Sequence, residues 1–279
     1  MKIIKTQLEL SGYLDSFRKN NFRLGLVPTM GALHKGHLSL IEQSKLICDF
    51  TVVSIFVNPT QFNNPDDLLK YPKPIAEDTK MLEQAGCDIL FLPEVNEMYQ
   101  NHEEWNYEVG ALNKILEGEF RPGHYKGVTQ IVFKLFDLVK PTVAFFGQKD
   151  YQQFLVIKNM NDDLNLGIEL VSCPIIREAN GLAMSSRNIR LNDVQREKAL
   201  TLYQSLLFFK ENYYRYSIDE LLEKAIEFYQ NDEDLKLEYF KICDQNTLLD
   251  KQINDKESAI ALVACLVGET RLIDNMMLP

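Results

Sequence analysis

Residues 22–37, FRLGLVPTMGALHKGH, decide the fold class because they lead from an apolar strand through a glycine-containing turn into a helix. Phe22–Thr29 is mostly apolar and predicts a strand that ends in a loop. Met30–Leu33 forms the predicted turn, and His34–His37 opens a helix that continues through Leu38–Cys48, where apolar residues recur at helical spacing. A strand followed closely by a helix is typical of the βαβ unit, and therefore of a parallel sheet.

The same alternation of strand and helix continues to residue 172. Phe50–Val57 (FTVVSIFV) is an almost unbroken apolar, β-branched run, the pattern of a strand buried within a parallel sheet. Further strands are predicted at 88–92, 142–146 and 168–172, and further helices at 75–85, 125–138 and 150–160. The predicted fold class is α/β, a Rossmann-like parallel sheet with helices on both faces. Ligands of such sheets bind at the carboxyl ends of the strands.

The alternation stops after Arg190. Two consecutive helices are predicted there, followed by two strands, at 193–214, 218–230, 237–243 and 259–267. Elements that are grouped by type predict a separate, smaller α+β C-terminal domain. We therefore expect a Rossmann-like nucleotide- and substrate-binding domain at 1–176 and a small α+β lid domain at 177–279.

The composition argues against several classes of protein. The chain has 279 residues, 46% hydrophobic and 25% charged, as in globular proteins. A formal net charge of −10 repels phosphate backbones, so we expect no nucleic-acid partner. No apolar run approaches the roughly 20 residues that cross a membrane, and Glu9 and Asp15 interrupt the stretch where a signal peptide would be apolar. The 5 scattered cysteines include no C-x-x-C pair, which is typical of reduced thiols in a cytoplasmic protein.

Met30–His37 (MGALHKGH) has the composition of a phosphate-binding segment. A helix N-terminus presents unpaired N–H groups and about half a positive charge, and Gly31 and Gly36 let a nucleotide approach the backbone. His34 lies three residues before His37, so both imidazoles share one face of the first turn and can donate to phosphate. Two alternatives remain: a metal site, for which no third ligand is apparent nearby, and ordinary surface or capping histidines.

A second polar segment, Met184–Arg187 (MSSR), follows the last strand predicted in the first domain. Its two hydroxyls suit the β- and γ-phosphates of a nucleotide, and its arginine can grip phosphate bidentately. Gly181 would let this loop move over the nucleotide. The alternative interpretation is a mobile linker between domains.

A third segment, Gly147–Asp150 (GQKD), lies at the carboxyl end of a predicted strand. Lys149 is a charge on a flexible stem that can reach a phosphate, and Asp150 can accept from a ribose hydroxyl or cap the next helix. Gln153 lies one helical turn beyond Asp150 and can face the same cleft. The alternative is a helix cap beside a surface lysine.

A fourth segment, at the end of the strand 50–57, carries two neutral amides. Asn58 and Gln61 can fix the hydroxyl and carboxylate groups of a small polar substrate, and Pro59 stiffens the loop between them. An ordinary Asn-Pro turn is the alternative.

Two of these segments resemble the signatures of the nucleotidyltransferase superfamily. H-x-G-H at His34–His37 resembles the first signature, and the segment around Met184–Arg187 resembles the K-M-S-K-S-like loop, with Ala183 and Ser186 in place of the lysines. The resemblance implies ATP bound with its α-phosphate open to attack.

Six segments in order resemble the pantoate–β-alanine ligase family, and they span residues 27–188: VPTMGALHKGH, SIFVNPTQF, the Tyr71-Pro72 step with Glu77-Asp78, RPGHYKGV, FFGQKDYQQ and GLAMSSRN. The tail from 189 to 279 matches that family in length only. Lys73 replaces a common arginine, and Asn180 stands where an acidic residue is usual.

The resemblance implies an AMP-forming ligase that condenses pantoate with β-alanine through a pantoyl-adenylate and releases pyrophosphate, with ATP as co-substrate and Mg²⁺. It implies that His37, His34 and Lys149 are catalytic. It also implies substrate binding by Asn58, Gln61 and Gln153, with Gln61 meeting β-alanine too. The ATP site that it implies comprises Met30, Gly31, Ala32, Leu33, His34, Lys35, Gly36, His37, Gly147, Gln148, Lys149, Asp150, Ile176, Met184, Ser185, Ser186 and Arg187. Asp78 or Glu77 would assist the metal through water, and the family suggests a homodimer.

Two other functions remain as alternatives. A simple adenylyltransferase of the same superfamily would transfer AMP to a phosphate ester and would lack the second acceptor site that Asn58, Gln61 and Gln153 suggest. The other alternative is a non-catalytic ATP-binding module or RNA binder. The net charge of −10 argues against RNA, and the histidine pair together with Lys149 and Arg187 argues against an inactive site.

Overall fold

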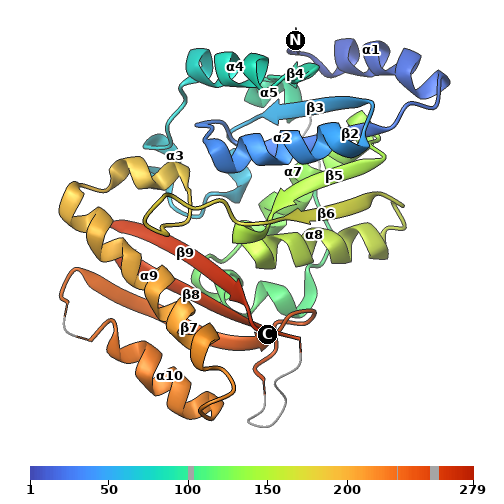
Figure 1. The fold of residues 1–279 in the computed structure, drawn as a ribbon. Helices are drawn as coiled ribbons and strands as arrows, with labels where there is room; N and C mark the ends of the chain where they lie inside the picture. The colour runs from blue at the N-terminus through green and yellow to red at the C-terminus, as the bar shows by residue number, and fades with distance from the viewer. Residues whose placement is uncertain (100–103, 231, 252–257) are drawn as a thin grey trace. The chain divides into compact units, whose positions relative to one another are not determined.

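The structure is a computed structural model that describes residues 1–99, 104–230, 232–251 and 258–279. The chain forms two compact units (Figure 1): Met1–Gly147 with Gln152–Pro174, and Gln148–Tyr151 with Ile175–Pro279. The short segment Gln148–Tyr151 therefore belongs by its contacts with the second unit, although it follows a strand of the first. The division at 176/177 into two domains remains a proposal.

The first unit is built on a parallel sheet. Six strands are present in the described residues, in the order β1-β4-β3-β2-β5-β6, and every pair is parallel. Their bounds are β1 Lys2–Ile4, β2 Leu24–Thr29, β3 Phe50–Ile55, β4 Ile89–Phe91, β5 Val143–Gly147 and β6 Glu169–Cys173. β2 lies between β3 and β5, so the order of strands reverses there, and the carboxyl ends of β2 and β5 meet at this switch point.

Helices cover both faces of this sheet, as predicted. α2 (Lys35–Ile47) contacts β2, β3 and β5, whereas α7 (His124–Val139) contacts β2 and α1 (Gln7–Lys19). On β5, Phe145 belongs to the same apolar cluster as residues of α2. The ring centroid of the next residue, Phe146, lies 6.4 Å from that of Phe136 on α7. Successive side chains of a strand point to opposite faces, so the two rings mark the two sides of the sheet.

The ends of the helices follow from local sequence. His34 caps α2. α7 begins after Gly123, which is left-handed, and ends at Val139, with Lys140 as its C-cap before Pro141. The remaining helices of the first unit are α3 Pro65–Leu69, α4 Ile75–Gln84, α5 Val95–Met98, α6 Glu117–Phe120 and α8 Tyr151–Asp163, the last beginning at a residue of the second unit. Short 3₁₀ helices occur at η1 Pro59–Gln61, η2 Gly110–Asn113, η3 Gln148–Asp150 and η4 Ser186–Arg190.

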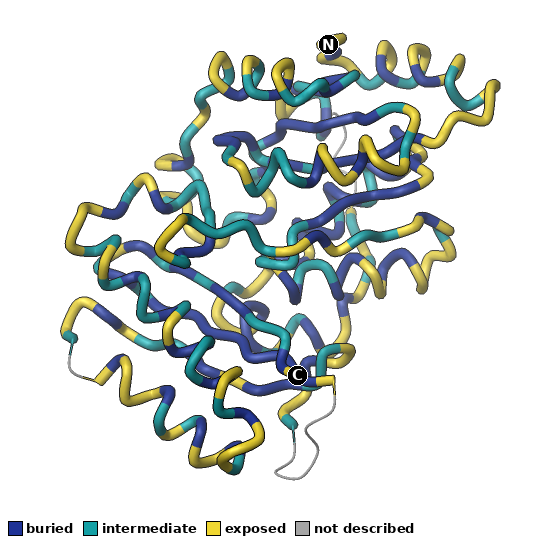
Figure 2. The backbone as a smooth tube through the Cα atoms, viewed as in Figure 1, coloured by how far each residue is buried: buried dark blue, intermediate teal, exposed yellow. Residues whose placement is uncertain are grey.

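The second unit is the smaller α+β domain that the grouped elements predict. β7 (Leu235–Asp244), β8 (Ala259–Val267) and β9 (Thr270–Met277) form an antiparallel sheet, and α9 (Asp193–Asn212) packs on β8 and β9. α10 (Ile218–Glu227) contacts α9 and β7. Figure 2 shows the central strand β8 almost wholly buried. Its residues Ala261, Val263 and Cys265 belong to the same apolar cluster as residues of α9 and α10.

Several elements were not predicted, among them β1, α1 and β9. β1 has three residues, too few for a periodicity to appear. β9 contains Asp274 and Asn275, which interrupt its apolar pattern. Both are buried, and they matter for the site described below. In the described part of the chain no helix combines the length and apolar character needed to cross a membrane.

Candidate active site

The turn after β2 is held by a buried carboxylate from α4. Asp78, whose side chain is 1% exposed, accepts the backbone N–H of Ala32 at 2.8 Å and of Leu33 at 2.7 Å. Gly31 has φ +81, and a Cβ there would lie 3.0 Å from Oδ2 of Asp78 and from Ile55, so the turn requires glycine. Burial raises the pKa of Asp78, and the two N–H groups offset this only in part.

The first turn of α2 brings the two predicted histidines together. Nδ1 of His34 accepts the backbone N–H of Gly36 at 3.1 Å, and Nδ1 of His37 accepts the backbone N–H of His34 at 3.3 Å. The ring centroids are 4.1 Å apart. A neutral imidazole that accepts at Nδ1 carries its proton on Nε2. His34 is therefore a capping residue, one of the alternatives from sequence, and each ring also has an Nε2–H that can donate to an anion.

The loop after β3 adds an amide to this turn. Nε2 of Gln61 donates to Sδ of Met30 at 2.9 Å, so the first and fourth predicted segments meet within the first unit. Oε1 of Gln61 accepts from Nδ2 of Asn58 at 3.2 Å, which fixes the orientation of the Gln61 amide. The Gln61 amide is thereby held with its NH₂ group toward Met30 and its carbonyl oxygen toward Asn58.

Asn58 is held entirely by protein groups. Its side chain is 1% exposed, and Nδ2 also donates to the carbonyl of Gly127 at 3.0 Å. Oδ1 accepts from the hydroxyl of Tyr99 at 2.6 Å and from that of Thr60 at 3.1 Å. In this structure Asn58 positions Gln61, and its predicted role in binding pantoate stays a prediction.

The RPGHYKGV segment supports the same loop, although sequence reasoning assigned no site residue to it. Nδ1 of His124 lies 2.8 Å from the carbonyl of Gln61, and Nη1 of Arg121 lies 3.0 Å from Nε2 of His124. Because an arginine only donates, Nε2 accepts and Nδ1–H donates, which keeps this imidazole neutral. Gly127 packs so closely that a Cβ would lie 2.3 Å from the carbonyl oxygen of Thr60.

The last two glutamines of FFGQKDYQQ, Gln152 and Gln153, have different surroundings. Gln152 is buried, donates to the carbonyls of Leu112 and Ile115, and accepts the backbone N–H of Glu117. Gln153 is half-buried in α8, and its side-chain amide makes no hydrogen bond to the described residues. The structure therefore separates a structural glutamine from one whose amide can serve a ligand.

In the second unit, the backbone of Gln148 and Lys149 is held by Asn275 of β9. Nδ2 of Asn275 donates to the carbonyl of Gln148 at 2.9 Å and to that of Lys149 at 3.0 Å. The Lys149 ammonium lies 3.6 Å from a carboxylate oxygen of Asp150, and its side chain is only 17% exposed. Neither Asn275 nor its neighbour Asp274 was identified from sequence. The available signal was a pair of polar residues inside an otherwise apolar segment.

The predicted phosphate-binding loop of the second unit is a short hairpin. The backbone N–H of Met184 donates to the carbonyl of Ile176 at 3.0 Å. Arg177 and Ala183 form an antiparallel β-bridge through their backbones. Gly181 turns the hairpin with φ +101, and a Cβ there would overlap the ring of Tyr203 at 2.2 Å. The glycine is thus required by the turn and by close packing, a reason different from the loop mobility expected.

The end of this hairpin brings Met184–Arg187 into a 3₁₀ turn. Oγ of Ser185 accepts the backbone N–H of Arg187 at 3.3 Å at the start of η4. Ser186 and Arg187 follow on η4 and are half-buried. Asn180, one of the two departures from the family pattern, accepts the N–H of Leu182 at 3.3 Å through Oδ1, an acceptor that an aspartate would also provide.

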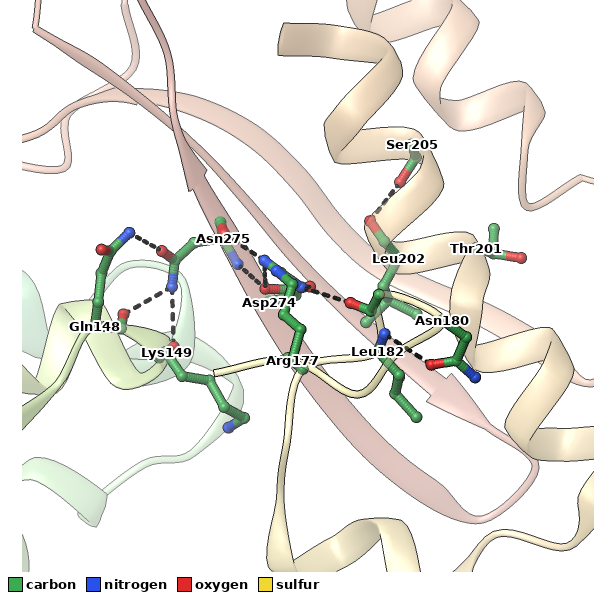
Figure 3. A network of polar contacts seen from close by, with 12 residues as sticks. Gln148, Lys149, Arg177, Asn180, Leu182, Thr201, Leu202, Ser205, Asp274 and Asn275 are labelled. Atoms are coloured by element: carbon green, nitrogen blue, oxygen red, sulfur yellow. Dashed lines mark hydrogen bonds and ion pairs between the residues drawn. The ribbon is translucent and has the colours of Figure 1, made fainter. Parts of the chain in front are cut away.

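A buried ion pair joins this hairpin to β9. Arg177 donates from both terminal nitrogens to Asp274, at 2.6 and 2.9 Å, and its guanidinium lies 4.6 Å from the centroid of Tyr203. Burial raises the pKa of Asp274, and the attraction of Arg177 opposes this effect. Figure 3 shows the connected contacts from the hairpin through Asp274 to Gln148 and Lys149.

The structure offers no ready-made metal cage in the part of the chain it describes. No group of three or more His, Cys, Asp or Glu side chains there is arranged to hold an ion. Asp78 already accepts one N–H on each oxygen, and Glu77 is exposed. The predicted water-mediated role of these two carboxylates stays a prediction.

The cysteines offer no activated nucleophile. All 5 are free of disulfides, and burial raises the pKa of Cys87, Cys243 and Cys265 to about 12. A thiol with so high a pKa has little thiolate at neutral pH.

Comparison with known proteins places this arrangement among ATP-using ligases. A family model described as pantoate-beta-alanine ligase matches residues 2–277. The pantothenate synthetase of Bacteroides thetaiotaomicron is 43% identical over 279 residues, which cover 99% of this chain and 98% of that protein. The crystal structure of pantothenate synthetase from Thermus thermophilus matches with a TM-score of 0.95 and 39% identity over 100% of both chains. A pantoate-beta-alanine ligase from Francisella tularensis, complexed with beta-gamma ATP and beta-alanine, matches with a TM-score of 0.83 and 34% identity, covering 99% of this chain and 97% of that one.

Proposed function

The chain belongs to the pantoate–β-alanine ligase family, and from that premise we propose that it condenses pantoate with β-alanine at the expense of ATP. The reaction forms pantoyl-adenylate and pyrophosphate, and then pantothenate and AMP. The observation in this chain that carries the proposal is the histidine pair on α2, whose Nδ1 atoms accept backbone N–H groups. Their Nε2–H groups are the donors that a reacting phosphate requires.

In the first step a carboxylate oxygen of pantoate attacks the α-phosphate of ATP, and pyrophosphate leaves. Donors from His34, His37 and Lys149 stabilise the negative charge that builds on the phosphate oxygens. The helix N-terminus that follows the Met30–Leu33 turn adds the partial positive charge of its N–H groups. Ser185, Ser186 and Arg187 are proposed to hold the outer phosphates, with Arg187 as a bidentate donor.

In the second step the amine of β-alanine attacks the activated carbonyl, and AMP leaves. We propose that Gln61 and Gln153 orient pantoate, and that Gln61 also meets the amine. The fixed amide of Gln61 supports this role, because Asn58 and Met30 hold it in one orientation. Holding two reactants in place accelerates such a step without a covalent enzyme intermediate.

Mg²⁺ is proposed to enter with ATP. It usually binds through substrate phosphates, waters and one or two carboxylates, and not through an all-protein cage. The donor set here fits that description only partly, because both oxygens of Asp78 already accept N–H groups. Glu77 and Asp78 would therefore reach the ion through water, and the ion would neutralise charge on the departing pyrophosphate.

Three further proposals concern the second domain, the oligomeric state and the location of the protein. The second domain is proposed to shield the adenylate from water, since hydrolysis would waste it. The family resemblance supports a homodimer. The scattered cysteines without C-x-x-C support a cytoplasmic location.

The first experiment measures release of AMP and pyrophosphate from MgATP with pantoate, with and without β-alanine. We expect steady AMP formation only when both substrates are present, and a stoichiometric burst of pyrophosphate with pantoate alone. No turnover with either substrate would reject the ligase. Phosphate-ester acceptors would then test the adenylyltransferase alternative.

His37→Ala tests the role of the imidazole pair. Loss of one transition-state donor should lower kcat about 10²- to 10³-fold. Folding should change little, because the His37 side chain is only half-buried in the first turn of α2. Glu42→Gln, an exposed substitution on the same helix, is the matched control and should keep the parental kcat. Full turnover by His37→Ala would remove that residue from the mechanism.

A further inference from the structure

Asn275 forms a three-bond clamp on the segment that carries Lys149. Its Nδ2 donates to the backbone carbonyls of Gln148 at 2.9 Å and Lys149 at 3.0 Å, and its Oδ1 accepts from Nε2 of Gln148 at 3.2 Å. The side chain is 2% exposed, so water does not compete for these bonds. Figure 3 shows the carboxamide of Asn275 facing Gln148 and Lys149. Both donor hydrogens of the amide are used on two successive carbonyls of one turn.

The clamped segment has little structure of its own to fix it. After β5 ends at Gly147, residues 148–150 form a single 3₁₀ turn, a conformation with poor hydrogen-bond geometry. Gly147 is still paired with Cys173 of β6, but a Cβ at Gly147 would meet nothing within 4 Å, so no side-chain packing there fixes the turn that follows. The direction in which Lys149 leaves the backbone therefore depends on what holds the two carbonyls.

The clamp is itself held rigidly. Oδ1 of Asp274 accepts the backbone N–H of Asn275 at 2.8 Å, and both carboxylate oxygens of Asp274 accept from Arg177. Arg177 also donates to the carbonyl of Gly181 at 3.0 Å. Because Asp274 fixes the backbone of Asn275, the Asn275 side chain can in turn fix the backbone of Gln148 and Lys149. Outer-shell partners orient metal ligands in the same way.

We propose that Asn275 is a positioning residue for Lys149: it aligns the backbone of Gln148 and Lys149 so that the ammonium meets the phosphates of ATP. This inference rests on the proposed function of Lys149 as a donor in adenylate formation. Lysine is a point charge on a flexible stem, so its reach is set by the backbone from which it extends. A misplacement of about 1 Å can cost on the order of 10²-fold in rate.

A merely structural clamp would have different consequences from a positioning clamp. Loss of buried hydrogen bonds in either case lowers the free energy of unfolding. Only a positioning residue loses its effect on turnover once Lys149 itself has been removed, because the two substitutions then act on the same interaction.

The experiment is a double-mutant cycle with Asn275→Ala and Lys149→Met, in which kcat and the KM for pantoate are measured. We expect Lys149→Met to lower kcat about 10²- to 10³-fold and Asn275→Ala about 10- to 100-fold. KM for pantoate should stay at the parental value in Asn275→Ala, since its proposed ligands Gln61 and Gln153 belong to the first unit. The double variant should be no slower than Lys149→Met within about 2-fold.

Hydrogen exchange followed by mass spectrometry adds a readout of the clamp itself. Peptides that cover 147–153 should exchange faster in Asn275→Ala, while peptides from β2 and β3 stay at the parental rate. If Asn275→Ala does not fold, Asn275→Ser, which keeps one donor in a smaller side chain, replaces it and should give a smaller loss of kcat. Ser205→Ala is the matched control: Ser205 is fully buried in the same unit and hydrogen-bonds Leu202 and Tyr229, so its loss should affect stability and not kcat.

The outcomes separate the two proposals. If Lys149→Met loses activity but Asn275→Ala keeps the parental kcat, or the two effects multiply in the double variant, the positioning role is overturned and the ligase mechanism stands. Unchanged exchange in 147–153 overturns it as well. If Lys149→Met keeps the parental kcat, the proposed donor role of Lys149 fails, and the positioning role falls with it.

Discussion

Asp78 and Asp274 are buried carboxylates that organise the candidate site residues of the two units in different ways. Asp78, 1% exposed, is met by two backbone N–H groups of the turn after β2. Asp274, 4% exposed, is met by the guanidinium of Arg177 and by one backbone N–H. Burial raises the pKa of both groups. The difference is that the first charge is stabilised by peptide dipoles and the second by an opposite charge.

This difference predicts which substitutions lower the stability of each unit. A carboxylate that accepts backbone N–H groups stabilises a turn, and its removal leaves those N–H groups without an acceptor. A buried ion pair gains little over an apolar pair of the same shape, yet removal of one partner leaves an isolated charge. The second unit should therefore lose more stability than the first when the contact of its carboxylate is broken.

The largest effect expected is that of Arg177→Met. It leaves Asp274 buried without its cation and should lower the free energy of unfolding by about 3–5 kcal/mol, measured by urea denaturation. Arg177→Met combined with Asp274→Leu should recover part of this loss, because no charge then remains buried. The control is Arg23→Met, which breaks an exposed pair with Glu169 and should cost less than about 1 kcal/mol. Equal losses for Arg177→Met and Arg23→Met would mean that burial of Asp274 does not matter.

Asp78→Ala should have the next largest effect. The N–H groups of Ala32 and Leu33 lose their acceptor, at about 1–3 kcal/mol each, but the unfavourable burial of the charge is relieved. We expect a net loss of about 2–3 kcal/mol in the free energy of unfolding, with reduced kcat because the turn leads into His34. The control is Asp49→Ala, whose carboxylate accepts one exposed N–H and whose loss water can replace. A stable Asp78→Ala with parental kcat would show that the turn is fixed by its sequence alone.

The comparison also shows which parts of the site a sequence can predict. His34, His37 and the turn before them were predicted because strand, turn and helix are contiguous, and their geometry follows from helical spacing. Asn58 and Gln61 were identified as amides, but their internal hydrogen bond and the contacts of Asn58 with Tyr99 and Gly127 depend on tertiary packing. Asp78 was predicted to assist a metal ion, but its hydrogen bonds with backbone N–H groups 45 and 46 residues away were not predicted.

The second unit was less predictable for the same reason. β9 was not predicted because Asp274 and Asn275 interrupt its apolar pattern. The hydrogen-bond partners of these two residues, Arg177 and Gln148, lie 97 and 127 residues away. No local pattern links Asn275 to Lys149. The fold class, by contrast, followed from periodicity alone, since buried parallel strands and amphipathic helices have patterns that do not depend on distant partners.

The smallest effect expected is a pH dependence that tests why Asp78 differs from Asp274. Because burial raises the pKa of Asp78 above 3.8, the folded protein holds this proton more tightly than the unfolded chain does. As pH rises above about 3.8, the unfolded chain loses the proton first, so this group's contribution to stability declines until the folded pKa is passed. Asp78→Asn lacks the group, whereas Asp274 is present in both proteins and its titration cancels in the difference. The free energy of unfolding of the parent minus that of Asp78→Asn should therefore fall from pH 4 upward and then become constant, with a slope below about 1.4 kcal/mol per pH unit. A difference that instead rises with pH would mean that the N–H groups of Ala32 and Leu33 outweigh burial, and that backbone dipoles hold this charge in preference to the neutral acid.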